Sequence, residues 1–362
     1  MKRTALGLSL IGAWATVGWA DGFMTPSVRS VPTAVVLPSG PLVRSPRQEA
    51  VLIFDGATVE VILRTHFRAG PDDVAWLIPV PAKPTQVRTR EGGLFDQLER
   101  DTAPRFFRIE RSRQAWGKGG AGGFGDLFGG AGPPQGDGVT VVPPVVVEAA
   151  GTAGIFEWVA LDARDAGKLV DWLTDNQYAV PHGARPLMER YVQEGWKWLA
   201  AKIRPQANDK QQLAPEPLAY TYADQRLVYP LAISRLSADE ENEIILYVLA
   251  DRRYFPGNWG HTTLRRKTIR QVADYAPLLR RMAWRRGGYL FITELAFDLT
   301  VLDPSILRRI RGVWDLPDPT PTLYLTRLRA LIKPEAMDRD VVMKPTYSNR
   351  PVGRYFELAD EE

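Results

Sequence analysis

The stretch between Gly154 and Ile203 constrains the fold more than any other part of the chain, because its pattern predicts a strand, two helices and a second strand. Residues 155–161 are rich in β-branched and aromatic side chains, which favour a half-buried strand. Asp162 follows this run and is a good N-cap for a helix. The sequence therefore predicts a strand, helix, helix, strand unit near the middle of the chain.

The helices of this unit are predicted from apolar spacing and from their end signals. Apolar residues recur at helical spacing after the first strand, at Ala166, Leu169, Val170 and Leu173. A second helix is expected over residues 185–194, with Pro186 in its first turn. Gly195 should end this helix, and residues 196–203 then predict the return strand.

The remaining segments favour a sheet-rich fold. Asp55 and Gly56 form a strong hairpin signal between strand patterns over residues 50–54 and 58–67. Further strands are predicted over residues 74–78, 139–147, 217–222, 227–233, 243–249 and 289–299. With 362 residues, 45% of them hydrophobic, the chain can bury a large core. We therefore expect an α+β fold in which mainly antiparallel sheet packs against the central helix pair.

Four other segments have weaker or mixed patterns. Residues 94–100 predict a short helix, and the acidic residues 237–242 predict a solvent-facing loop. Residues 268–286 are basic and should be helical apart from a break at Pro277, whereas residues 322–332 could be strand or helix.

The N-terminus has the features of a secretory signal peptide. Lys2 and Arg3 precede an apolar run, and small residues precede Asp21. We expect residues 1–20 to be removed and the protein to be exported to the periplasm or cell envelope; retention of this segment as an anchor is the alternative. No later apolar stretch is long enough for a transmembrane span.

The mature chain is expected to have one main α+β domain over residues 21–300. Residues 301–362 should form a C-terminal extension that packs on this domain and ends in a polar tail. Residues 117–138 are rich in glycine and predict a disordered loop. The glycines at residues 120–125 match a dinucleotide-binding fingerprint in spacing, but no helix follows them, so we reject that interpretation.

The chain is free of cysteine, which excludes disulfides, thiol nucleophiles and cysteine zinc sites. His66, His182 and His261 lie too far apart in the sequence for a metal-ligand motif. A Ser-His-Asp triad stays open, although no nucleophile elbow marks its serine. We therefore expect no cofactor and no metal.

Four carboxylates could supply a pair for glycan hydrolysis, namely Asp72, Asp73, Glu157 and Asp162. Ordinary turn and cap roles explain Asp72, Asp73 and Asp162 better. The tryptophans Trp158, Trp172, Trp196 and Trp198 could line a ligand groove, but their positions on one folded unit favour a packing role.

A cluster of cations is the sharpest electrostatic feature. It comprises Arg265, Arg266, Lys267, Arg270, Arg280, Arg281, Arg285 and Arg286, against Asp274 alone. With Trp284 it could form a helical face that binds anionic lipid, acidic polysaccharide or nucleic acid. Export disfavours nucleic acid as the partner. The alternative is a solvated face that pairs with the acidic segment near Glu240.

The chain also resembles a bacterial family known as domain of unknown function 2330. The resemblance rests on residues 74–81, 95–98, 103–104, 163–169, 172–178, 192–202, 229–233, 249–254 and 325–328. It implies an exported envelope protein with no established activity and no catalytic residues to transfer. Relatives often have a cysteine after the signal peptide, where this chain has Asp21, so a lipid-anchor or disulfide role would not transfer.

Three functions are compatible with the sequence. The first is a non-enzymatic exported protein that binds an envelope component or a protein partner. The second is a carboxylate-dependent hydrolase of an envelope polymer. The third is binding to an anionic surface through the cationic segment.

Overall fold

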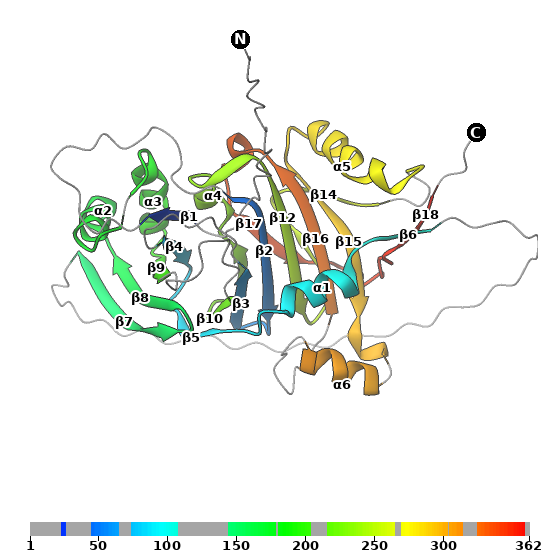
Figure 1. Cartoon of the computed structure of the whole chain (residues 1–362), viewed down its shortest axis with the longest axis horizontal. Coiled ribbons are helices and arrows are strands. Elements are labelled where there is room, and N and C mark those ends of the chain that lie inside the picture. The colour runs from blue at the N-terminus through cyan, green and yellow to red at the C-terminus, as the bar shows by residue number, and fades with distance from the viewer. Residues whose placement is uncertain are drawn as a thin grey trace, which may run out of the picture.

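Two β-sheets of different size, with helices on their outer faces, form the body of the protein (Figure 1). The computed structural model describes residues 23–26, 45–64, 74–107, 144–178, 180–203, 216–264, 269–302, 304–313 and 324–358. Within these residues the chain is a mixed α/β protein whose sheets are largely antiparallel and whose helices are short. The expected sheet type is therefore confirmed.

The smaller sheet has five strands in the order β1 (Phe23–Pro26), β4 (Val74–Val80), β9 (Lys197–Ile203), β8 (Phe156–Ala163) and β7 (Val145–Ala153). All neighbouring strands are antiparallel. Between β8 and β9 the chain forms α2 (Ala166–Asp175) and α3 (Ala184–Gln193). The predicted strand, helix, helix, strand unit is thus confirmed.

The cap of α2 differs from the prediction. Asp165, not Asp162, is the N-cap, and its side chain accepts a hydrogen bond from the Lys168 backbone N–H at 2.7 Å. Asp162 lies inside β8, where its carboxylate is 2.7 Å from the Lys197 ammonium on β9. The strand runs past Asp162 because Asp162 pairs with Lys197 of β9 and the next residue, Ala163, pairs with Val145 of β7.

The larger sheet has eight strands in the order β14 (Gly260–Thr263), β15 (Leu290–Asp298), β16 (Tyr324–Ile332), β12 (Ala238–Ala250), β2 (Ser45–Phe54), β3 (Thr58–Arg64), β10 (Leu218–Ala223) and β5 (Thr85–Thr89). Its strand pairs are antiparallel except β2 with β12 and β14 with β15. The predicted hairpin is confirmed between β2 and β3. At its turn, Asp55 Oδ1 accepts hydrogen bonds from two backbone N–H groups, and Gly56 has a φ of +98°.

A continuous core joins the inner faces of the two sheets. Leu52, Leu246 and Leu328 of the larger sheet share this buried cluster with Trp76 and Leu199 of the smaller one. A three-stranded sheet, β11 (Leu227–Tyr229), β17 (Val341–Pro345) and β13 (Tyr254–Pro256), completes it.

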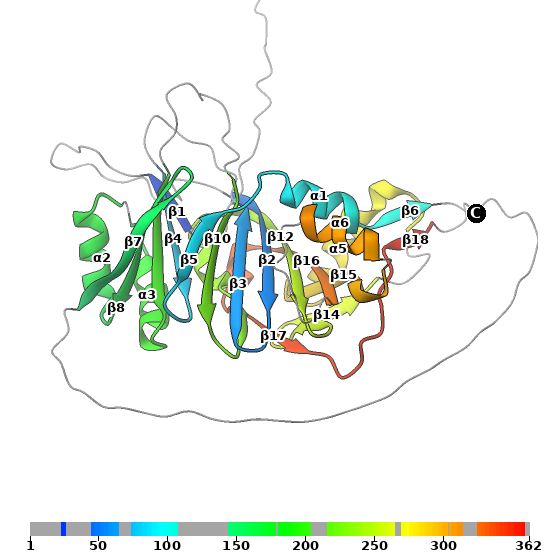
Figure 2. The same ribbon diagram turned by 90° about the horizontal axis from the view of Figure 1, so that it is seen from below.

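The outer faces of both sheets are covered by helices (Figures 1 and 2). Helices α2 and α3 pack on the smaller sheet, so the predicted helix pair covers that sheet only. Helices α1 (Leu94–Thr102), α5 (Tyr275–Trp284) and α6 (Pro304–Val313) pack on the larger one. The strands β6 (Arg105–Phe107) and β18 (Tyr355–Glu357) form a parallel pair beside α5.

Three local predictions are wrong. Residues 237–242 are not an exposed loop, because β12 begins at Ala238 and the Asn242 side chain is fully buried. Residues 231–234 form the short helix α4 (Leu231–Ser234) instead of strand. Helix α5 is unbroken at Pro277, because the first N–H groups of a helix have no intrahelical acceptor and proline is tolerated there.

Several predictions concern residues outside the described ones. They are the signal peptide, the glycine-rich segment, His66, Asp72, Asp73, Arg265, Arg266 and Lys267. The division of the chain at residue 300 also stays a prediction; residues 324–332 form an inner strand of the larger sheet. Among the helices that the structure describes, none combines the length and apolar character needed to cross a membrane.

Candidate functional site

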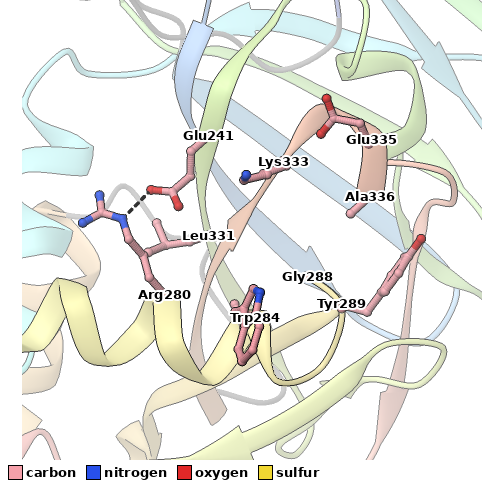
Figure 3. Close-up of a pocket in the computed structure, with 11 residues that line it drawn as sticks. Glu241, Arg280, Trp284, Gly288, Tyr289, Leu331, Lys333, Glu335 and Ala336 are labelled. Atoms are coloured by element: carbon pink, nitrogen blue, oxygen red, sulfur yellow. Dashed lines mark hydrogen bonds and ion pairs between the residues drawn. The ribbon is translucent and has the colours of Figure 1, made fainter.

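A pocket of about 560 Å³ lies at the C-terminal end of α5 (Figure 3). It is bounded by this helix, by the ends of β12 and β16, and by the 3-10 turn η3 (Pro334–Ala336). Its lining comprises Glu241, Arg280, Ala283, Trp284, Gly287, Gly288, Tyr289, Leu331, Lys333, Glu335 and Ala336. This volume is typical of small-molecule sites.

The sequence of α5 explains the shape of this pocket. Tyr275, Leu279 and Ala283 form the buried stripe of the helix, which turns its arginines outward. Gly287 and Gly288 have φ values of +63° and +88°, and the Gly288 N–H donates to the Ala283 carbonyl at 2.9 Å. Two left-handed residues therefore end the helix sharply.

One cation of the pocket is paired with a carboxylate of the neighbouring sheet. Arg280 Nε on α5 lies 2.8 Å from Glu241 Oε2 on β12, as Figure 3 shows. The expected pairing between the basic helix and the acidic segment is thus confirmed for Arg280. Lys333 and Glu335 are exposed, and neither side chain has a hydrogen bond or ion pair with the residues that the structure describes.

Three further arginines near the C-terminal end of α5 do not line the pocket and have no partner among the described residues. Arg281 lies in the last turn of α5, and Arg285 and Arg286 follow the helix. All three are exposed, and within the described ranges their guanidinium groups make no hydrogen bond or ion pair. The end of α5 therefore carries an uncompensated positive charge.

The two large aromatic residues of the pocket differ in their freedom. Trp284 is 82% exposed and has no ring contact among the described residues. The Tyr289 ring lies 5.3 Å from the Trp259 ring, and the Arg339 guanidinium lies 4.7 Å from its centre. The Tyr289 hydroxyl also donates to Asp338 at 3.0 Å. Trp284 is thus the open aromatic surface of the site, and Tyr289 is held in place.

The predicted cationic cluster is only partly brought together. Arg280, Arg281, Arg285 and Arg286 lie at the C-terminal end of α5. Arg270 lies before the 3-10 turn η1 (Val272–Asp274), at the opposite end of the helix. Sequence reasoning missed Lys333 and Glu335, which are far from α5 in the chain. No local signal identifies them, because the order of strands β15, β16 and β12 brings them to the pocket.

A second group of charges lies on the outer face of the larger sheet, beneath α1 and α5. Arg327 Nε is 2.7 Å from Glu294 Oε2, and Arg327 Nη2 is 2.7 Å from Glu99 Oε2 on α1. Arg64 Nη2 and Arg47 Nη2 approach Glu49 at 2.5 and 2.7 Å. These charges compensate one another, so we assign the network a structural role that holds α1 on the sheet.

This network also shifts the pKa of Glu99. Burial acts to raise the pKa of Glu99, but attraction by Arg327 and Arg47 outweighs it and leaves the pKa lowered.

Glu294 enters the network at a β-bulge, where the pairing of β15 with β16 shifts between Thr293 and Leu295. The charges of β2 and β16 alternate along their strands, at Arg47 and Glu49 and at Arg327 and Arg329. That spacing indicates a charged face on each strand, but it identifies neither the partners of these charges nor the helices that cover them.

The histidines do not form a site in the described residues. His182 is exposed in the turn before α3. His261 lies on the edge strand β14 with its ring 4.5 Å from the Phe255 ring, and burial and the nearby Arg253 lower its pKa. Across the described ranges, no three histidine or acidic side chains are grouped so that they could hold a metal ion.

Of the carboxylates considered for hydrolysis, the two that the structure describes are not paired by the fold. Glu157 and Asp162 lie an odd number of positions apart on β8, whose pairing with β9 has no shift between them. Side chains alternate along a strand, so these two point to opposite faces of the smaller sheet.

The tryptophans of the central unit pack as predicted. Trp196 and Trp198 are buried between the smaller sheet and its helices. Trp172 is partly buried against the same cluster, and Trp158 packs against the core between the sheets. Trp284 is the tryptophan that lines the pocket.

Comparison with known proteins identifies one family and distant similarity to solved structures. The model of a family described as "Uncharacterized protein conserved in bacteria (DUF2330)" matches residues 27–344. No curated protein matches. A mutated baculovirus P35 after caspase cleavage is similar at 9% identity and a TM-score of 0.30, over 57% of this chain and 66% of that one. Baculovirus P35 itself is similar at 9% identity and a TM-score of 0.32, over 60% and 67%. Neither similarity assigns a function.

Proposed function

We propose that this chain, which belongs to the bacterial DUF2330 family, is an exported, non-enzymatic protein that binds an anionic component of the cell envelope. The signal-peptide pattern of residues 1–20 supports export. The surface at the C-terminal end of α5 supports anion binding.

One observation carries this proposal: Trp284 is 82% exposed among three arginines that have no partner in the described part of the chain. Guanidinium groups attract an anionic partner over a distance that depends on salt. An exposed indole adds a large apolar contact once the partner is close. Together, the guanidinium groups and the indole are more favourable in contact with a polar, negatively charged partner than in contact with water alone.

Folding alone does not explain this arrangement. Arg281 lies where a cation interacts favourably with the helix dipole. Arg285, the C-cap of α5, lies four residues after Arg281, a spacing at which like charges destabilise a helix by roughly a few tenths of a kcal/mol. A bound anion would relieve this repulsion.

The alternative hydrolase is less well supported. It needs two carboxylates about 5 to 10 Å apart on one side of a cleft. Glu157 and Asp162 do not meet this requirement, because they point to opposite faces of their sheet.

The binding proposal is tested by chromatography of the full-length protein on immobilised dextran sulfate and on neutral dextran. We expect retention on dextran sulfate at about 50 mM NaCl and loss of most of it at about 500 mM, since salt screens exposed charges. Absence of retention at low salt, or equal retention on neutral dextran, would contradict the proposal. Export is tested separately by cell fractionation and N-terminal sequencing, which should find a chain that begins near Asp21.

A further inference from the structure

The charges inside the pocket differ from those around it. Arg280 and Lys333 face two carboxylates, Glu241 and Glu335, so the formal charges of the lining residues cancel. Arg281, Arg285 and Arg286 outside the pocket have no such compensation. The surrounding surface therefore attracts polyanions in general, whereas the lining of the pocket has no net formal charge.

The pocket also has two charged side chains that form no ion pair with the described residues. Glu241 is occupied by Arg280 at 2.8 Å. Lys333 and Glu335 make no ion pair with other described residues. A ligand would thus meet one free cation and one free carboxylate, together with the open ring of Trp284 (Figure 3). To contact all three, the ligand needs an anionic group for the cation, hydrogen-bond donors for the carboxylate and a flat apolar face for the ring.

We infer that the pocket binds an acidic sugar unit of an envelope polysaccharide. The sugar ring lies against Trp284, its carboxylate pairs with Lys333, and its hydroxyl groups donate to Glu335. This inference rests on the proposed function and names the class of ligand. A phosphodiester group suits the pocket less well, because it has no hydroxyl group that could donate a hydrogen bond to Glu335.

The inference is tested by calorimetric titration of the full-length protein with trigalacturonate and with the neutral maltotriose. The titration uses about 500 mM NaCl, so that the outer arginines are screened. We expect trigalacturonate to bind more tightly than maltotriose. Trp284→Ala and Lys333→Met should each weaken trigalacturonate binding by about tenfold or more.

Two variants separate this inference from the proposed function. Trp284→Phe keeps an aromatic face and should retain part of the affinity that Trp284→Ala loses. The double variant Arg281→Ala, Arg285→Ala should elute from dextran sulfate at clearly lower salt than the wild type, yet bind trigalacturonate at high salt within about threefold of the wild type. Thermal unfolding of each variant checks that an exposed substitution leaves the fold intact.

The inference fails if trigalacturonate does not bind, if maltotriose binds equally well, or if Trp284→Ala has no effect. It also fails if phosphatidylglycerol vesicles bind through Trp284 and Lys333 while trigalacturonate does not, since the pocket would then belong to a lipid surface. In each of these cases the protein could still be retained on dextran sulfate. The proposed anion-binding function is therefore tested separately, by the chromatography described above.

Discussion

The Arg327 guanidinium lies 2.7 Å from the Glu294 carboxylate, and neither side chain is exposed to solvent. Removing one partner of such a pair leaves a buried charge without compensation. Arg327→Met should therefore lower the free energy of unfolding by about 3 to 5 kcal/mol. Urea unfolding of the purified variant measures this loss.

The matched control is Arg252, which pairs with Asp251 at 2.8 Å but is 50% exposed. Arg252→Met should change the free energy of unfolding by about 0 to 1 kcal/mol, because water screens an exposed pair. Equal effects of the two substitutions would show that the buried network does not carry the assigned structural role.

A second prediction compares two buried tyrosines. The Tyr275 hydroxyl donates to the Glu294 carboxylate, whereas the buried Tyr222 hydroxyl has no hydrogen-bond partner among the described residues. Tyr275→Phe should cost about 1.5 to 3 kcal/mol of stability, the range for a hydrogen bond to a charged group. Tyr222→Phe should be close to neutral. Thermal or urea unfolding distinguishes them, and a larger loss for Tyr222→Phe would refute the assignment.

A third prediction concerns Asp340, a buried carboxylate between α3, α4 and β17. Its Oδ1 accepts hydrogen bonds from the Tyr191 hydroxyl at 2.7 Å and from the Ala232 N–H at 2.9 Å. Burial raises the pKa of Asp340 above 3.8, although these two donors act to lower it. Between pH 3.8 and the raised pKa, the folded protein holds a proton that the unfolded chain has released. Stability due to this group therefore falls as pH rises through that window.

Asp340→Asn removes the titration but keeps one oxygen for both donors. Its stability relative to the wild type should rise with pH across the window and be constant above it. Asp340→Ala loses both hydrogen bonds and should be destabilised by about 1 to 3 kcal/mol at every pH. Urea unfolding over a pH series tests this, and a constant difference between Asp340→Asn and the wild type would contradict the raised pKa.

A fourth prediction concerns the β2–β3 turn. Gly56 has a φ of +98°, which side-chain-bearing residues rarely adopt. Gly56→Ala should therefore lower stability by about 1 to 2 kcal/mol. Gly92, with open space at its Cβ position and a φ outside this region, is the control. Gly92→Ala should leave stability within about 1 kcal/mol of the wild type in the same thermal unfolding measurement.

Local signals predicted the elements whose structure depends on their own residues. The turn at Asp55 and Gly56 and the apolar stripe of α2 are examples, because hairpin geometry and helical periodicity are properties of short segments. The error at Asp162 has the same origin. Its residue type suits a cap, but Asp162 still pairs with β9 and the next residue, Ala163, pairs with β7, so the strand continues beyond it.

Features that depend on strand order could not be predicted in this way. Arg327 and Arg329 alternate with Leu328 and Ala330, a pattern typical of a half-exposed strand, yet α1 and α5 cover that face. Lys333 meets Arg280 in the pocket only because β16 lies between β15 and β12. The cationic character of α5 and its pairing with the acidic segment near Glu240 were predicted from the sequence, whereas the place of Glu335 in the pocket was not.

The most direct test of the proposed function is the salt concentration at which two double variants elute from dextran sulfate. Arg281→Ala, Arg285→Ala removes two cations from the end of α5, and Arg185→Ala, Arg235→Ala removes two exposed cations elsewhere. Both variants lower the net charge of +4 by the same amount. We predict that the first elutes at clearly lower salt than the wild type and the second with the wild type. Equal shifts for both, or no shift for the first, would contradict an anion-binding surface at the end of α5.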